Sequence, residues 1–287
     1  MTLDQRIVDV YDRFTRGDIS RRELLDRLVT LAGGAAAGLA LLPLVEGDAA
    51  AQVVPENDSR LGTERIKYDA AGTQMTGYLA RLKPAQKRPA VLVISEIWGL
   101  NAHIEDVTRR FAIEGFLALA PDVLSPTGGT PPDSQQAFKL IGALNPQESV
   151  TRMAATVAFL AKHAESTGKV GVVGFCWGGG MVNQVAVAAG TAVNAAVAYY
   201  GPQVPAGDVP RISAPLLLHY GSLDTRINGG IADYEAALKA NKKTYEIFMY
   251  EGAAHAFNND TNEKSYNKAA ATLAWGRTVA FFRKYLV

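Results

Sequence analysis

The chain has 287 residues, of which 48% are apolar and 20% charged, and its formal net charge is +1. These values are typical of a globular protein with a sizeable core, and the scattered, balanced charge argues against nucleic acid as a partner. The single cysteine excludes an internal disulfide framework and a multi-cysteine site, and the four histidines lack metal-ligand spacing, so we expect no metal.

Residues 1–51 have the order of an export signal. The pair Arg21-Arg22 precedes a mildly apolar run from Leu28 to Val45, and the small residues Ala49 to Ala51 follow. This order resembles a twin-arginine signal and predicts a periplasmic or secreted protein. Because acidic residues balance the arginines before the run, an N-terminal helical extension that packs on a cytoplasmic protein is the alternative. Glycines dilute the short run, so we expect no stable membrane span.

Residues 52–63 read as a polar linker, and residues 64–287 form the predicted domain. The domain opens with two short segments of antiparallel type, 65–69 and 75–82, which a glycine-containing turn separates. The continuous apolar run 89–95 follows, and it is typical of a strand that is buried on both faces.

From that point strands and helices alternate. The patterns predict helices over 103–114, 147–164, 230–240 and 267–285, and strands over 116–120, 170–173, 195–200, 215–220 and 245–250. Such alternation implies right-handed crossovers and a mostly parallel sheet with helices on both faces. The sequence therefore predicts an α/β fold.

The chemistry is expected where the strand 170–173 ends. The motif Gly-x-Cys-x-Gly follows that strand and precedes a helix-compatible pattern, with Cys176 at its centre. Gly-x-Ser-x-Gly in this context forms a nucleophile elbow, and here cysteine takes the place of serine. We expect no room for a side chain at Gly174 or Gly178, and we expect the amide of Trp177 to face a developing oxyanion. Alternatively, Cys176 is a small buried hydrophobe at a strand end.

A nucleophilic cysteine needs a base and a group that orients the base, and two later loops supply candidates. Asp224 follows the strand 215–220, and His255 follows the strand 245–250. The order nucleophile, acid, histidine is that of α/β-hydrolases. Alone, Asp224 could be an ordinary turn residue and His255 an ordinary loop residue.

The other three histidines are not expected to take part in this chemistry. His219 lies within an apolar strand, so we expect it to pack in the core. His103 and His163 lie on predicted helices, and we expect both to face solvent.

Five stretches resemble the dienelactone hydrolase (carboxymethylenebutenolidase) family of the α/β-hydrolase superfamily. They occur in the family's order within residues 62–287, and they are Ser95–Asn101, Gly174–Gly179, Tyr199–Gly201, Gly221–Asp224 and His255–Phe257. The resemblance implies an α/β-hydrolase fold with a catalytic triad of Cys176, Asp224 and His255. It also implies an oxyanion hole that the amides of Ile97 and Trp177 form.

The resemblance further implies that Glu96 faces the thiol and controls its ionisation, and that Tyr199 lines the substrate pocket. Without the family, Glu96 could equally be a polar cap at a strand end. Well-known members carry serine and arginine where this chain has Ala256 and Asn259, and the arginine binds the substrate carboxylate. A neutral asparagine cannot replace that cation. Arg226 could replace the arginine as the cation that binds the substrate carboxylate, although we rather expect it to be an ordinary surface residue.

These observations predict a hydrolase that cleaves a small ester or lactone through a thioester acyl-enzyme, without a cofactor. One alternative is a general short-chain carboxylesterase or thioesterase. Another is a catalytically silent α/β-hydrolase fold that binds a small ligand, which an intact triad argues against. The sequence leaves the natural substrate and the oligomeric state open.

Overall fold

The computed structural model describes residues 53–287, together with Glu23 and Arg27. The paired arginines, the apolar run and the predicted cleavage point lie outside the described residues, so export remains a prediction. Within the described part of the chain, no helix combines the length and the hydropathy that a membrane crossing requires.

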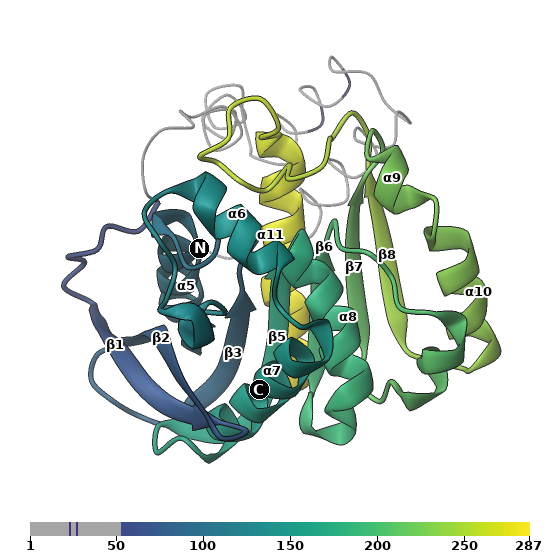
Figure 1. Ribbon diagram of the computed structural model, residues 1–287. Coiled ribbons are helices and arrows are strands. Elements are labelled where there is room, and N and C mark those ends of the chain that lie inside the picture. Colours follow the sequence, from purple (N-terminus) through teal and green to yellow (C-terminus); the bar gives the residue numbers. More distant parts are fainter. Residues whose placement is uncertain (1–22, 24–26, 28–52) are drawn as a thin grey trace.

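The described chain is built on one eight-stranded sheet with the strand order β1-β2-β4-β3-β5-β6-β7-β8 (Figure 1). The strands are β1 Leu61–Ala70, β2 Thr73–Leu82, β3 Arg88–Ile94, β4 Leu117–Pro121, β5 Ser166–Phe175, β6 Ala195–Tyr199, β7 Leu216–Gly221 and β8 Tyr245–Tyr250. Strands β1 and β2 pair in antiparallel fashion, and β2 pairs antiparallel with β4. The remaining pairs, from β4 across to β8, are parallel. The predicted mostly parallel α/β sheet is confirmed.

Over residues 53–287, seven α-helices lie between the strands or follow the last of them. They are α5 Ala102–Ile113, α6 Ser134–Gly142, α7 Pro146–Lys162, α8 Trp177–Ala188, α9 Thr225–Asn228, α10 Ile231–Ala240 and α11 Lys268–Leu286. Polar side chains begin α5, α6, α7 and α11, where Asn101, Asp133, Asn145 and Asn267 accept the free amide hydrogens of the first turn. The sequence pattern does not predict α6 or the four-residue α9, because neither has a long apolar stripe.

The sheet separates two hydrophobic cores, as the alternation of side chains along buried strands requires. In β3, Leu92 belongs to the core shared with α7, α8 and α10, whereas Val91 and Val93 belong to the core shared with α5 and α11. In Figure 1, α7 and α8 lie in front of the sheet and α11 lies behind it. Both faces are therefore covered, and the loops at the carboxyl ends of the parallel strands are left to carry the site.

Candidate active site

Cys176 lies in a sharp turn between β5 and α8. Its backbone has φ 56° and ψ −114°, a conformation that costs free energy for a residue with a side chain. The turn is held on both sides, because the Cys176 amide donates to the Tyr199 carbonyl at 3.0 Å and the Gly180 amide donates to the Cys176 carbonyl at 3.1 Å. This is the strand-turn-helix geometry that the motif predicts, with the side chain half-buried.

The glycines on either side of Cys176 are required by close backbone contacts. A Cβ at Gly174 would lie 2.2 Å from the Gly178 carbonyl oxygen, and a Cβ at Gly178 would lie 2.4 Å from the carbonyl oxygen of Ile94. Real Cβ atoms do not approach backbone so closely, so the expected lack of room at both positions is confirmed. The same contacts bring the loop after β3 against the start of α8.

The structure brings Cys176, His255 and Asp224 together from the ends of β5, β8 and β7. The Nε2 atom of His255 lies 3.0 Å from Cys176 Sγ, and the opposite ring nitrogen, Nδ1, is hydrogen-bonded to Asp224 Oδ2. Asp224 is buried, and its other carboxylate oxygen accepts the Ile227 amide at the start of α9. Thiol, imidazole and carboxylate therefore form a continuous hydrogen-bonded series of the kind that activates a nucleophile.

The surroundings of Cys176 favour the protonated form of its thiol. Burial raises the pKa of Cys176 to about 11, and the negative charges of Glu96 and Asp224 add to the increase. The backbone amide of Trp177 and the positive charge of Arg226 act in the opposite direction. The thiol therefore needs a base to remove its proton at neutral pH, and His255 is in contact with it.

The amides proposed for the oxyanion hole lie on two adjacent loops. Trp177 is the first residue of α8, and its amide donates toward the thiol. Ile97 is in the loop after β3, and this loop is beside the turn because Ile94 pairs with Gly174 in the sheet. An oxyanion hole needs two amide donors that converge on the substrate carbonyl oxygen, so the part taken by Ile97 stays a prediction.

Glu96 is buried next to this constellation. Its carboxylate accepts hydrogen bonds from the Tyr200 hydroxyl at 3.3 Å and from Asn259 Nδ2 at 2.6 Å. Burial raises the pKa of Glu96, while His103, Asn259 and Tyr200 oppose that increase. Asn259, at the position where the family's arginine is expected, therefore binds the glutamate as a neutral donor.

Tyr199 does not lie where the resemblance implied. Its side chain is fully buried, and its hydroxyl is 2.7 Å from Thr278 Oγ1 on α11. Tyr200 faces the site instead, with its ring centroid 5.1 Å from that of His255. Tyr199 ends β6 with its hydroxyl toward α11, whereas Tyr200 follows at φ 38° with its hydroxyl toward Glu96. The sequence feature that could have indicated Tyr200 is its position directly after the predicted strand, where site residues are expected.

His103 does not face solvent, contrary to the prediction from the sequence. It is 4% exposed, and its Nδ1 lies 3.0 Å from Asp260 Oδ1, because the loop that carries Asn259 and Asp260 folds over the first turn of α5. His163 is only half-buried at the end of α7, where its Nδ1 accepts the Glu165 amide. The prediction that both histidines face solvent is wrong for His103.

His219 is buried in β7, as predicted, but it also has polar partners. The Tyr250 hydroxyl lies 2.9 Å from His219 Nδ1, and Thr278 Oγ1 lies 3.1 Å from Nε2. Burial lowers the pKa of His219 to about 3, so the ring is neutral at physiological pH.

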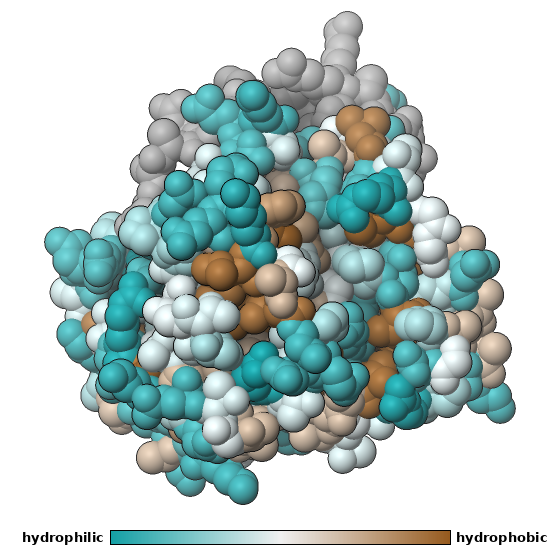
Figure 2. Space-filling view, in the orientation of Figure 1, coloured by the Kyte–Doolittle hydropathy of each residue, from teal (hydrophilic) through white to brown (hydrophobic). Residues whose placement is uncertain are grey.

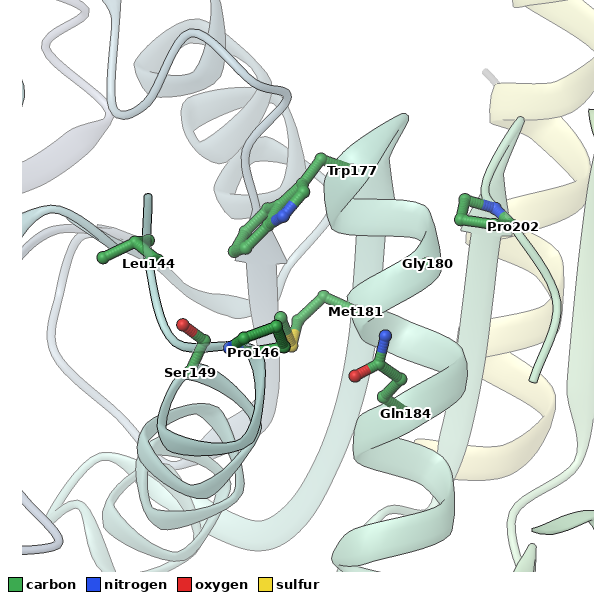
Figure 3. A pocket seen from close by; sticks show the side chains of 8 residues that line it. All are labelled: Leu144, Pro146, Ser149, Trp177, Gly180, Met181, Gln184 and Pro202. Carbon is green, nitrogen blue, oxygen red and sulfur yellow. The ribbon is translucent and has the colours of Figure 1, made fainter. Parts of the chain in front are cut away.

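A pocket of about 190 Å³ lies beside the start of α8 (Figure 3). The indole of Trp177 lies at one end of it, and its other lining residues are Leu144, Pro146, Ser149, Gly180, Met181, Gln184 and Pro202. The pocket adjoins the residue that follows Cys176 but does not include the Cys176, His255 and Asp224 constellation. Over residues 53–287, no group of three histidine, cysteine, aspartate or glutamate side chains has an arrangement that could hold a metal ion.

Known proteins share this architecture. The model of the Dienelactone hydrolase family matches residues 75–286. The chain is 33% identical over 258 residues to the "Putative carboxymethylenebutenolidase" of Saccharolobus solfataricus, which covers 77% of this chain and 98% of the relative. It is 32% identical over 248 residues to the "Probable 2-oxo-3-(5-oxofuran-2-ylidene)propanoate lactonase" of Bradyrhizobium sp, covering 79% of this chain and 98% of the relative.

A solved structure agrees with these relatives. The crystal structure of a "Putative Dienelactone Hydrolase" from Klebsiella pneumoniae superposes with a TM-score of 0.72 and 31% identity, and the match covers 78% of this chain and 99% of that chain. The predicted α/β-hydrolase fold is thereby confirmed.

Proposed function

Because this chain belongs to the dienelactone hydrolase family, whose members are hydrolases of esters or lactones, we propose that Cys176 is the nucleophile of such a hydrolase. The observation that carries the proposal is the 3.0 Å contact between Cys176 Sγ and His255 Nε2, with Asp224 on the other ring nitrogen. A protein that only binds a ligand has no need of this series, which disfavours the catalytically silent alternative.

In the acylation step, His255 removes the thiol proton while Sγ forms a bond to the carbonyl carbon of the substrate. The carbonyl oxygen becomes an oxyanion, which the amides of Trp177 and Ile97 stabilise. The intermediate then expels the alkoxide, and His255 returns the proton to it. The product is a thioester on Cys176 and, for a lactone, the alcohol remains part of the same acyl group.

In the deacylation step, a water molecule attacks the thioester carbonyl and gives a proton to His255. The second tetrahedral intermediate collapses and breaks the carbon–sulfur bond, which releases the carboxylic acid, and His255 returns its proton to the sulfur to restore the thiol. Asp224 keeps the imidazole in the tautomer that presents Nε2 to sulfur, and it stabilises the imidazolium that forms in each step.

We propose that neutral esters and lactones are preferred as substrates. Asn259 is a neutral donor already bound to Glu96, so it provides no cation for a substrate carboxylate. Burying a carboxylate without a cationic partner is costly, whereas a neutral ester has no such cost. This preference differs from the carboxylated lactone named for the Bradyrhizobium relative.

The surface near Glu96 also favours a neutral substrate. The ring centroid of Trp98, two residues from Glu96, lies 6.0 Å from that of Phe138, which is 48% exposed on α6. Figure 2 shows apolar surface in the middle of this face, in the region of α6. An aromatic pair of this kind binds apolar acyl or alcohol groups better than charged ones.

The proposed reaction can be tested with a chromogenic short-chain ester. Hydrolysis should be measured before and after treatment with a thiol alkylator, and the protein has one cysteine, so alkylation modifies only Cys176. We expect alkylation to abolish hydrolysis. Full activity of the alkylated protein would contradict the cysteine mechanism.

A further inference from the structure

The loop after β3 contains a tight turn that its own backbone closes. The Gly99 amide donates to the Glu96 carbonyl at 3.3 Å, so Ile97 and Trp98 are the two central residues of the turn. Gly99 has φ 72°, a left-handed conformation that favours glycine. Because the Ile97 amide lies within this turn, its orientation depends on how the turn is fixed to the rest of the fold.

Thr130, in the loop after β4, contacts the far end of the turn. The Leu100 amide donates to Thr130 Oγ1 at 3.0 Å. The two loops are packed closely at this point, because a Cβ at Gly99 would lie 2.4 Å from the same oxygen. The position of the turn therefore depends on the position of one hydroxyl group.

Asp122 fixes the Thr130 hydroxyl. It follows β4, its side chain is buried, and its Oδ1 accepts the hydroxyl at 2.7 Å while its Oδ2 accepts the Thr130 amide at 2.8 Å. The Leu124 amide donates to the same carboxylate at 3.0 Å. Since the hydroxyl donates its hydrogen to Asp122, its oxygen is available as the acceptor for the Leu100 amide. Hydrogen bonds to a carboxylate are stronger than neutral ones, so this series restrains the turn firmly.

The same segment of chain also packs against the turn at a second point. Phe138 lies on α6, which follows the Thr130 loop, and its ring centroid is 6.0 Å from that of Trp98. The segment from Asp122 to Phe138 therefore contacts the turn through a hydrogen bond at Leu100 and through an aromatic pair at Trp98. Two contacts at different points restrict rotation of the turn, as the support of an oriented donor requires.

We propose that Thr130 is a positioning residue for the hydrolysis, and that Asp122 orients it. The inference rests on the proposed function, in which the Ile97 amide stabilises the oxyanion. A turn that is restrained in this way keeps the amide directed at the substrate carbonyl, so the donor does not reorganise as negative charge develops on the oxygen. The loop after β4 thereby takes part in the reaction through the turn rather than through the substrate.

The experiment compares Thr130→Val, which removes the hydroxyl, with Thr130→Ser, which retains it. Thr127→Val is the matched control, because the Thr127 hydroxyl donates to the Leu124 carbonyl at 2.9 Å within its own loop. For each protein, kcat and KM are measured with a neutral chromogenic short-chain ester. The rate of Cys176 alkylation by iodoacetamide is measured on the same samples, and circular dichroism establishes that each variant is folded. Alkylation forms a sulfur–carbon bond as iodide leaves a saturated carbon, so it produces no oxyanion.

Thr130→Val should lower kcat by about tenfold or more, since removal of an oxyanion donor costs about 10²–10³ in kcat and misorientation costs part of that. Its KM and its alkylation rate should each stay within about twofold of the parent values, because neither depends on stabilisation of the transition state for acyl transfer. Thr130→Ser should keep kcat within about threefold of the parent value, because its hydroxyl can make both hydrogen bonds. Thr127→Val should behave as the parent protein does.

Three results would overturn the proposal: an unchanged kcat in Thr130→Val, an equal loss of kcat in Thr130→Ser, or equal losses of hydrolysis and alkylation in Thr130→Val. If Thr130→Val does not fold, Thr130→Ala removes the hydroxyl without placing a methyl group against Asp122 and Leu100, and the same results decide. Absence of ester hydrolysis by the parent protein would instead contradict the proposed function, and this inference with it.

Discussion

Asn259 donates a 2.6 Å hydrogen bond to Glu96 although 163 residues separate them in the chain. The amide is held in place, because its oxygen accepts the Thr261 amide at 3.0 Å and the Thr261 hydroxyl at 2.7 Å. Asn259 therefore contributes an oriented neutral donor to the candidate active site rather than a mobile side chain. The proposed preference for neutral substrates depends on this contact.

Replacing Asn259 with arginine should shift the enzyme toward carboxylated substrates. A guanidinium that reaches the site adds a charge-assisted hydrogen bond to the substrate, worth about 1–3 kcal/mol. The measurement is the ratio of kcat/KM for a neutral ester and its carboxylated analogue, in both proteins. Asn262→Arg places the same side chain on an exposed position of the same loop and should leave the ratio unchanged.

The unsubstituted protein can contradict the proposed preference for neutral substrates. If its kcat/KM for the carboxylated ester equals or exceeds that for the neutral ester, then another cation already binds the carboxylate. Arg226 is the first candidate, because it is exposed and its charge acts on Cys176.

Much of this site could be predicted from the sequence because it depends on local patterns and on topology. The glycines around Cys176 and the chain order of Asp224 and His255 place three side chains at the carboxyl ends of parallel strands. The exchange of Tyr199 for Tyr200 could not be predicted, since it depends on one backbone angle at a strand end.

The burial of His103 and the position of Asn259 were also beyond prediction. Both depend on how the loop after β8 folds over α5 and the loop after β3, a long-range contact without periodic signal. The helix α6, which carries Phe138, was missed for a different reason. Its nine residues bury only Ala137 and Ile141, too few for a helical stripe.

Gly178→Ala should destabilise the fold by about 2–4 kcal/mol, because the new Cβ would lie 2.4 Å from a backbone oxygen that cannot move freely. The free energy of unfolding in urea measures the effect. Gly207→Ala is the control, since a Cβ there meets no atom within 4 Å, and it should change stability by less than about 0.5 kcal/mol. Equal effects of the two substitutions would contradict the close packing of α8.

Acid should destabilise the protein partly through His219. Its pKa is about 3 in the folded protein, below the ordinary value of 6.5, so the unfolded chain binds a proton that the folded chain does not. The stability that His219 contributes is therefore complete above about pH 6.5 and falls as the pH decreases toward about 3, by about 1.4 kcal/mol per pH unit.

His219→Gln should remove this contribution. Between about pH 6.5 and about pH 5, the variant should lose about 2 kcal/mol less stability than the parent. Urea unfolding at both pH values measures the difference. His163→Gln serves as the control, because that histidine is only half-buried. Parallel losses in His219→Gln and the parent would show that His219 does not resist protonation.

Export should depend on Arg21 and Arg22. If they form a twin-arginine signal, protein recovered outside the cytoplasm should begin near Gln52, and changing both arginines to lysine should retain the protein inside. Arg13→Lys combined with Arg16→Lys is the matched control and should not affect export. An intact Met1 on protein from every compartment, found by N-terminal sequencing, would instead favour a retained helical extension.

The most direct test of the mechanism is the rate of ester hydrolysis by Cys176→Ala. Removing a nucleophile typically lowers kcat by several orders of magnitude, and this small half-buried side chain contributes little to packing. We expect the variant to keep the parent's circular dichroism spectrum and to lose nearly all hydrolysis of a neutral short-chain ester. A folded variant that retains more than about a tenth of the parent's kcat/KM would contradict catalysis by Cys176.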